Sequence, residues 1–111
     1  MDPVTEEQVH ALAATARPFS LVQLSWASGR YQRDADAIER EHQRRMVSLR
    51  AEGVIAVLCP VQSEGLCGVA IMTQPVEQAR ETIAADPCVQ AGMMTAEVLP
   101  CVGFPGDSLP G

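Results

Sequence analysis

The chain contains no lysine, so all eight of its positive charges are arginines. Enzymes that form a Schiff base need the amine of a lysine, and the phosphate-binding loop of nucleotide hydrolases carries a lysine after its glycines. The absence of lysine therefore excludes both kinds of chemistry.

Aromatic and basic side chains are also scarce. One Trp, one Tyr and two Phe make up an aromatic content of 4%, and the net charge is −6 with a pI near 4.7. Proteins bind nucleic acids through basic residues that neutralise phosphates and through aromatic rings that stack on bases. We therefore expect no nucleic-acid partner.

Long apolar runs are missing as well. No segment approaches the ~20 apolar residues that cross a bilayer, and the N-terminus lacks the basic and then apolar stretch of a signal peptide. The sequence accordingly predicts a cytoplasmic protein without a membrane partner.

The four cysteines, Cys59, Cys67, Cys88 and Cys101, show no pattern of a metal site. No two of them form a Cys-x-x-Cys pair, and no histidine lies at zinc-finger spacing from them. The chain also lacks a glycine-rich nucleotide-binding loop. We expect reduced thiols that act as small core residues, with neither a metal nor another cofactor.

What the chain does contain is the composition of a folded domain. Hydrophobic residues make up 47% of its 111 residues, which lies outside the range of disordered chains and suffices for one core. The predicted division is an N-terminal helical extension over residues 1–18, a folded domain over 19–102 and an irregular, Gly- and Pro-rich tail over 103–111.

Periodicity and helix breakers predict seven elements. The N-terminal helix is expected over Thr5–Arg17 and ends at Pro18. It is followed by a strand, a helix, two strands of a hairpin, a helix and a strand, expected over Phe19–Trp26, Asp34–Glu52, Val54–Cys59, Gly65–Met72, Pro75–Ala84 and Met93–Leu99. This order predicts an α+β, ferredoxin-like fold: a four-stranded antiparallel sheet with both helices on one face.

The two strands of the predicted hairpin read as continuous apolar runs, Val54–Cys59 and Gly65–Met72. An antiparallel sheet with one face in water would alternate apolar and polar residues. We therefore expect a second copy of the chain to cover the other face, as a sheet-to-sheet homodimer. The alternative cover is the N-terminal helix, folded back over part of the open face or across a partner's edge, but with a length of about 20 Å it would hide only part of a sheet.

His42 is one of two histidines and lies on the apolar face of its predicted helix, four residues after Ile38 and four before Met46. A buried imidazole needs a partner, and we expect it in Asp86, whose Asp-Pro step ends the second helix. A carboxylate beside one ring nitrogen fixes the tautomer, so that the other nitrogen can move a proton. The alternatives are a core histidine bonded to a backbone carbonyl and an aspartate that caps the backbone.

A cleft beside His42 needs walls, and the end of the first strand and the following loop can supply them. Ser25, Trp26 and Tyr31 are the predicted substrate-binding residues there. Arg45, three residues after His42, is expected to reach a substrate carboxylate. The alternatives are a core or interface position for Trp26 and a solvated helix face for Arg45.

Several of these residues carry a family resemblance: Glu41-His42, Met46, Leu49, Gly53, the strand ending in Pro60, and Ala84-Ala85-Asp86-Pro87-Cys88-Val89-Gln90-Ala91-Gly92. Through them the chain resembles, from Phe19 to Pro100, the YCII-related family of dimeric α+β barrel proteins. The resemblance implies that His42 and Asp86 form an acid–base dyad. Cys59 departs from the family, which usually has glycine before the proline.

The resemblance and the pair together lead us to expect a small cofactor-independent enzyme that transfers protons on a small organic substrate, as an isomerase, cyclase or lyase. A cofactor-free monooxygenase is one alternative, because similar dimeric barrels oxidise aromatic compounds. A non-catalytic ligand-binding accessory protein is another, since a fold does not fix a function. The expected partners are a small-molecule substrate and a second copy of the chain.

Overall fold

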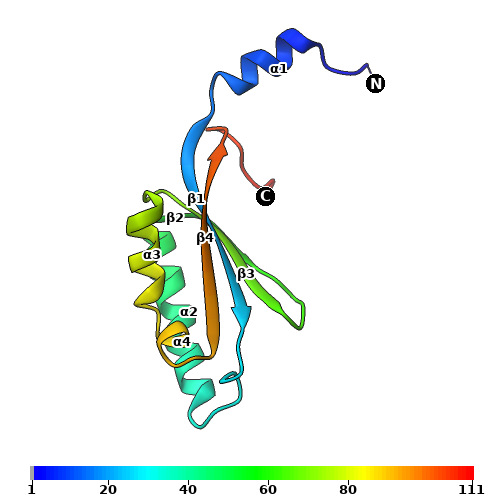
Figure 1. Cartoon of the computed structure of the whole chain (residues 1–111). Helices are drawn as coiled ribbons and strands as arrows, with labels where there is room; N and C mark the ends of the chain where they lie inside the picture. Colours follow the sequence, from blue (N-terminus) through cyan, green and yellow to red (C-terminus); the bar gives the residue numbers. More distant parts are fainter. Residues whose placement is uncertain (1) are drawn as a thin grey trace.

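The computed structural model describes residues 2–111 and contains one four-stranded antiparallel sheet (Figure 1). Its elements are α1 (Glu6–Ala13), β1 (Arg17–Trp26), α2 (Ala35–Ala51), β2 (Ile55–Pro60), β3 (Leu66–Met72), α3 (Val76–Ala84), α4 (Pro87–Gln90) and β4 (Met94–Gly103). The strands lie in the order β2-β3-β1-β4. The predicted α+β class and element order are confirmed, and the arrangement is compatible with a ferredoxin-like fold. Within residues 2–111, every helix is too short or too polar to span a bilayer.

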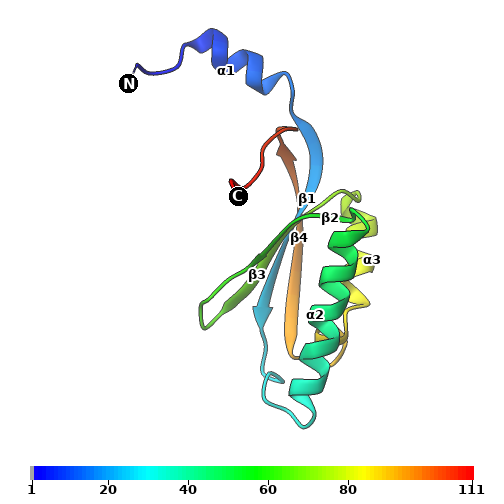
Figure 2. The same ribbon diagram turned by 180° about the vertical axis from the view of Figure 1, so that it is seen from behind.

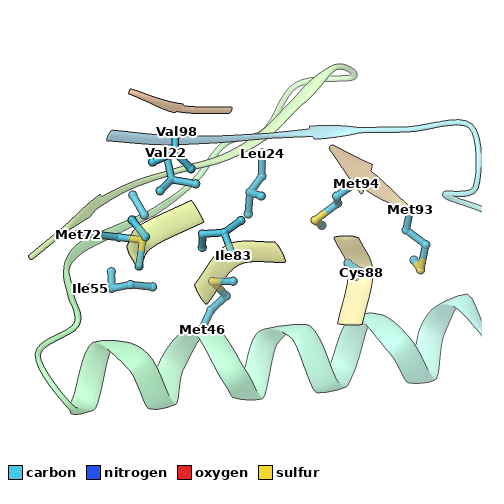
Figure 3. Packing of buried hydrophobic residues seen from close by; sticks show 12 residues of the cluster. Val22, Leu24, Met46, Ile55, Met72, Ile83, Cys88, Met93, Met94 and Val98 are labelled. Carbon is cyan, nitrogen blue, oxygen red and sulfur yellow. The ribbon is translucent and has the colours of Figure 1, made fainter. Parts of the chain in front are cut away.

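The core lies between the sheet and the helices α2 and α3. Alternate residues of β1, among them Val22 and Leu24, are buried on the helix side of the sheet. Met46 of α2 and Ile83 of α3 pack against them (Figure 3). Burial of each such side chain stabilises the fold by roughly 1.5–3 kcal/mol. The packing of Met46 therefore fixes which face of α2 meets the sheet, and His42 lies one turn earlier on that face.

The ends of α2 follow the prediction in part. Asp34 is the N-cap residue, as expected, but its backbone is left-handed with φ 66° and its side chain makes no capping hydrogen bond. At the other end, Gly53 has φ 80°. A left-handed residue after a helix is favourable for glycine, which has no Cβ to clash. The helix thus stops at the predicted glycine and turns into β2.

Three prolines lie within strands, although the prediction used them as breakers; one of them, Pro60, is the last residue of the edge strand β2. Pro18 belongs to β1, and β4 runs through Pro100 to Gly103. The β3 strand pairs with β1 only from Ser20 onward, and β4 is an edge strand. Each proline therefore lies where its strand has a neighbour on one side only, and a missing N–H is tolerated there. The predicted start of the first strand and end of the last strand were wrong for this reason, and α1 ends before Pro18 is reached.

The N-terminal helix α1 extends away from the rest of the chain, beyond the first residues of β1 (Figures 1 and 2). It is shorter than predicted and begins after a capping box made by Thr5 and Gln8. None of its residues is buried, and its apolar Val9 and Leu12 are 53% and 51% exposed. The alternative in which this helix covers the sheet of its own chain is therefore wrong.

The face of the sheet opposite the helices is largely apolar. Its apolar residues alternate with the core positions and are Phe19, Leu21, Val57, Val69, Ile71 and Leu99. Val57 and Leu99 are each 37% exposed. Gln23 and Glu97 add a polar pair on the β1–β4 half. No segment of residues 2–111 covers this open face, so the missing alternation in the sequence corresponds to an apolar surface.

Candidate active site

A cavity of about 880 Å³ opens between α2 and the sheet. Its walls come from one face of α2, from β1, β2 and β3, and from the loops that follow β1 and β2, with one residue each from α3 and β4. The hairpin of β2 and β3 diverges from α2 toward its tip (Figure 1), where the loop of residues 61–64 forms one rim. Sites for small organic molecules span roughly 300–1,000 Å³. The cavity is therefore large enough for such a ligand.

His42 lines this cavity, and its ring is hydrogen-bonded to Asp86 behind it. The distance from His42 Nδ1 to Asp86 Oδ2 is 2.8 Å. Asp86 is fully buried and His42 is 9% exposed. Asp86 is also the N-cap of α4, where Oδ2 accepts the backbone N–H of Cys88 at 3.0 Å. One carboxylate oxygen, Asp86 Oδ2, therefore has both roles that the sequence suggested as alternatives: it binds the His42 ring and it caps the backbone.

This geometry defines the tautomer of His42. An ionised carboxylate only accepts hydrogen bonds, so the Nδ1 atom carries the hydrogen and donates it to Asp86. The lone pair of the neutral ring then lies on Nε2. Among the hydrogen bonds of residues 2–111, none involves Nε2. That nitrogen is available to a molecule in the cavity.

We expect ¹⁵N-labelled protein to show the Nδ1–H tautomer of His42 in long-range ¹H–¹⁵N correlation spectra at a pH where the ring is neutral. The buried carboxylate holds the hydrogen on Nδ1. In Asp86→Asn, the amide can donate as well as accept, and the Nε2–H tautomer should gain population. His10, which is exposed on α1, serves as the internal control. A dominant Nε2–H tautomer in the wild type would contradict the hydrogen bond.

Arg45 contacts the far side of Asp86 and is not among the residues that line the cavity. Its Nη1 atom lies 3.7 Å from Asp86 Oδ1, and both atoms are buried without a hydrogen-bond partner. That separation is too long for a hydrogen bond but allows Coulombic attraction. The structure therefore places Arg45 as a support for the carboxylate, whereas the sequence predicted contact with a substrate.

Two of the three predicted wall residues lie at the cavity, and the third lies on the opposite face of the sheet. Trp26 and Tyr31 both line the cavity. Ser25 does not; it pairs with Thr95 of β4 on the opposite, open face. Successive residues of a strand point to opposite sides, so Ser25 and Trp26 cannot both face one cavity.

Sequence reasoning missed Arg30, a cavity residue in the loop after β1. Its guanidinium carbon lies 4.0 Å from the centroid of the Trp26 ring and 5.0 Å from that of Tyr31. Cys67 also lines the cavity, and its thiol donates to the backbone oxygen of Leu24. Burial raises the pKa of Cys67, while the nearby Arg30 charge acts in the opposite direction. The sequence feature that could have identified Arg30 is its position between Trp26 and Tyr31, directly before the tyrosine.

Cys88 lies beside the His42–Asp86 pair as a neutral thiol. Burial, together with the negative charge of Asp86, raises its pKa to about 12. His42, Asp86 and Cys88 are the closest approach to a metal-ligand set within residues 2–111, with donor atoms within 4.8 Å of one another. The imidazole and carboxylate are already bonded to each other, and Arg45 adds a positive charge that disfavours a cation. The cluster therefore fits proton transfer better than metal binding.

All four cysteines are free thiols, but their environments differ. Cys88 is fully buried, whereas Cys59 is exposed and Cys67 and Cys101 are half-buried. The prediction of small core residues thus holds for Cys88 and in part for Cys67, which packs against the core, and it is wrong for the exposed Cys59. Cys59 instead forms part of the cavity wall at the end of β2.

Comparison with models of known protein families finds no match, and comparison with curated proteins finds no match either. The resemblance to the YCII-related family consequently rests on the residues of the sequence and on an architecture that is compatible with it.

Proposed function

We propose that the protein is a cofactor-independent enzyme of the YCII-related type that transfers protons on a small organic substrate. One observation carries the proposal: the wall of a cavity of about 880 Å³ holds an imidazole whose Nδ1 is bonded to a buried carboxylate at 2.8 Å. Isomerisation, cyclisation and elimination fit this equipment, because each removes a proton from one atom and delivers a proton to another.

In the proposed reaction, His42 Nε2 takes a proton from a C–H bond next to a carbonyl group. The C–H electron pair moves into the carbonyl system, and an N–H bond forms on the ring. The positive imidazolium is stabilised by Asp86, which keeps its charge and holds the ring orientation. The same N–H then returns the proton to another atom of the substrate. Asp86 thus orients the base and never exchanges a proton with the substrate.

Solvent deuterium tests this step without knowledge of the natural substrate. We suggest 4-oxopentanoate, its methyl ester and a β-diketone as probes in D₂O, followed by ¹H NMR. The wild-type protein is expected to accelerate exchange at the carbon next to the carbonyl of at least one probe. Exchange at the buffer rate for all three would count against an accessible base in the cavity.

The proposed active unit is a homodimer that joins the open faces of two sheets. Apolar Leu21, Val69 and Ile71 support this, because they are half-buried within one chain and adjoin the exposed Val57 and Leu99. Two sheets stacked at about 10 Å would remove these side chains from water. A stable interface buries roughly 800 Å² on each partner, a scale that one face of a four-stranded sheet can approach.

Ile71→Asp is expected to convert this dimer into a monomer. A carboxylate at this position would be buried without a partner, and we expect the dimer to weaken by at least about a hundredfold. Light scattering should give twice the chain mass of 11.9 kDa for the wild type and the chain mass itself for the variant. Leu109→Asp, at a tail residue that is 79% exposed, is the matched control and should stay dimeric. A monomeric wild type at micromolar concentration would refute the dimer.

A further inference from the structure

Arg30 is held at the cavity by the only Trp and the only Tyr of the chain. Its guanidinium lies over both rings, 4.0 Å from the Trp26 centroid and 5.0 Å from the Tyr31 centroid. The negative face of each ring attracts the guanidinium charge. Trp26 is half-buried against the core, so it offers a fixed platform. Arg30 is therefore a positioned side chain of the wall and not a freely moving surface arginine.

The charge of Arg30 has no carboxylate partner among residues 2–111. The ion pairs there are His42–Asp86, Arg44–Glu41, Arg45–Asp86 and Arg80–Glu77. No hydrogen bond of the described residues uses the Arg30 guanidinium either. A stacked guanidinium keeps its N–H donors at the ring edge, where they can grip a carboxylate through two parallel hydrogen bonds. The donors of Arg30 thus remain available to a ligand in the cavity.

The other lining residues limit the kind of anion. Glu39 and Glu64 also line the cavity, and their negative charges disfavour a ligand with several anionic groups. Much of the remaining wall is apolar, including Leu58 and Met46. The cavity therefore combines one available cation, apolar surface and an imidazole.

We propose that this cavity selects a small molecule with a single carboxylate on an apolar body, and that Arg30 binds the carboxylate. The inference rests on the proposed function in one respect: it names the substrate class for the cavity in which His42 acts as the base. In this arrangement Arg30 holds the carboxylate of the substrate, and the reacting carbon of the substrate lies at His42.

The test compares benzoate with benzamide, which has the same shape and no charge. Titrations followed by ¹H–¹⁵N NMR give a dissociation constant for each probe. The wild type is expected to bind benzoate about tenfold more tightly, because hydrogen bonds to charged groups are the stronger kind. The net charge of −6 works against benzoate, so this preference requires a local cation. Wild-type protein that binds benzoate no better than benzamide, or does not bind it, would overturn the proposal.

Arg30→Gln should remove the preference, weakening benzoate about tenfold with little effect on benzamide. Arg33→Gln is the matched control, because Arg33 is exposed in the same loop and does not line the cavity. Arg30→Lys keeps the charge but loses the planar donor pair and should give an intermediate preference. An unchanged preference in Arg30→Gln would overturn the assignment to Arg30.

The two experiments distinguish carboxylate binding by Arg30 from proton transfer by His42. His42→Ala is expected to keep the benzoate preference, since the imidazole is not the proposed anion anchor. A retained preference in a wild type that exchanges no deuterium would reject the proposed function and leave the anion site standing. Deuterium exchange without any benzoate preference would do the reverse.

Discussion

His42→Ala is expected to slow deuterium exchange into a responsive probe by about 10²–10⁴-fold, the usual contribution of a general base. The methyl group of alanine cannot accept a proton, and His42 is the only histidine among the residues that line the cavity. The measurement is the ratio of kcat/KM for variant and wild type, with the circular dichroism spectrum as a check of folding. The proposal fails if the variant exchanges at the wild-type rate.

His10→Ala is the matched control, because His10 is the only other histidine and lies exposed on α1. The deuterium-exchange rate of His10→Ala should remain within about twofold of the wild-type rate, because the change lies on the surface and outside the cavity. Added imidazole should restore part of the activity of His42→Ala, since a small base can enter the space that the ring vacates. Rescue by imidazole would separate a chemical role from a purely structural one.

The pairing of His42 with Asp86 could be predicted although 44 residues separate them. Each residue has a strong local signal: helical periodicity places His42 on the buried face, and the Asp-Pro step marks the end of a helix. The element order then brings α2 and the end of α3 to the same face of one sheet. A long-range contact was therefore predictable because both partners lie at regular positions.

The positions of the Arg30 and Arg45 side chains could not be predicted from the sequence. Arg30 lies in a loop, and no periodicity specifies the path of a loop backbone or the direction of a long side chain. Arg45 lies on a helix, but its guanidinium can reach either the cavity or Asp86, and only the packed structure decides between them. Side chains with several rotatable bonds were thus placed less reliably than the ring of His42.

The errors at Pro18 and Pro100 have a different origin. Local rules treat proline as a breaker because it lacks an N–H donor. Whether that donor matters depends on the number of neighbouring strands, which is a property of the assembled sheet. The strand order leaves both prolines with a neighbour on one side only. Knowledge of the topology, and not of the local sequence, would have corrected the prediction.

Asp86→Ala is expected to lower the free energy of unfolding by about 3 kcal/mol, at the lower end of the cost of removing one partner from a buried ion pair. The change would leave the N–H of His42 Nδ1 and the backbone N–H of Cys88 without their acceptor, and it would remove the negative charge 3.7 Å from the Arg45 guanidinium. The lower end applies because the Arg45 side chain is 28% exposed and water can screen part of its charge. Such a loss would be a large share of the ~5–15 kcal/mol that stabilises a typical domain.

Urea unfolding followed by circular dichroism at a fixed protein concentration measures this loss. Asp86→Asn should cost less, about 1–3 kcal/mol, since its amide oxygen still accepts the Cys88 N–H while the charge is lost. Glu41→Ala is the matched control: its carboxylate is 61% exposed in a 3.9 Å pair with Arg44, and exposed pairs contribute at most about 1 kcal/mol. If Asp86→Ala were no more destabilising than Glu41→Ala, water would have to replace the carboxylate at both donors, His42 Nδ1 and the Cys88 backbone N–H. Asp86 would then set the tautomer of His42 without adding to the free energy of unfolding.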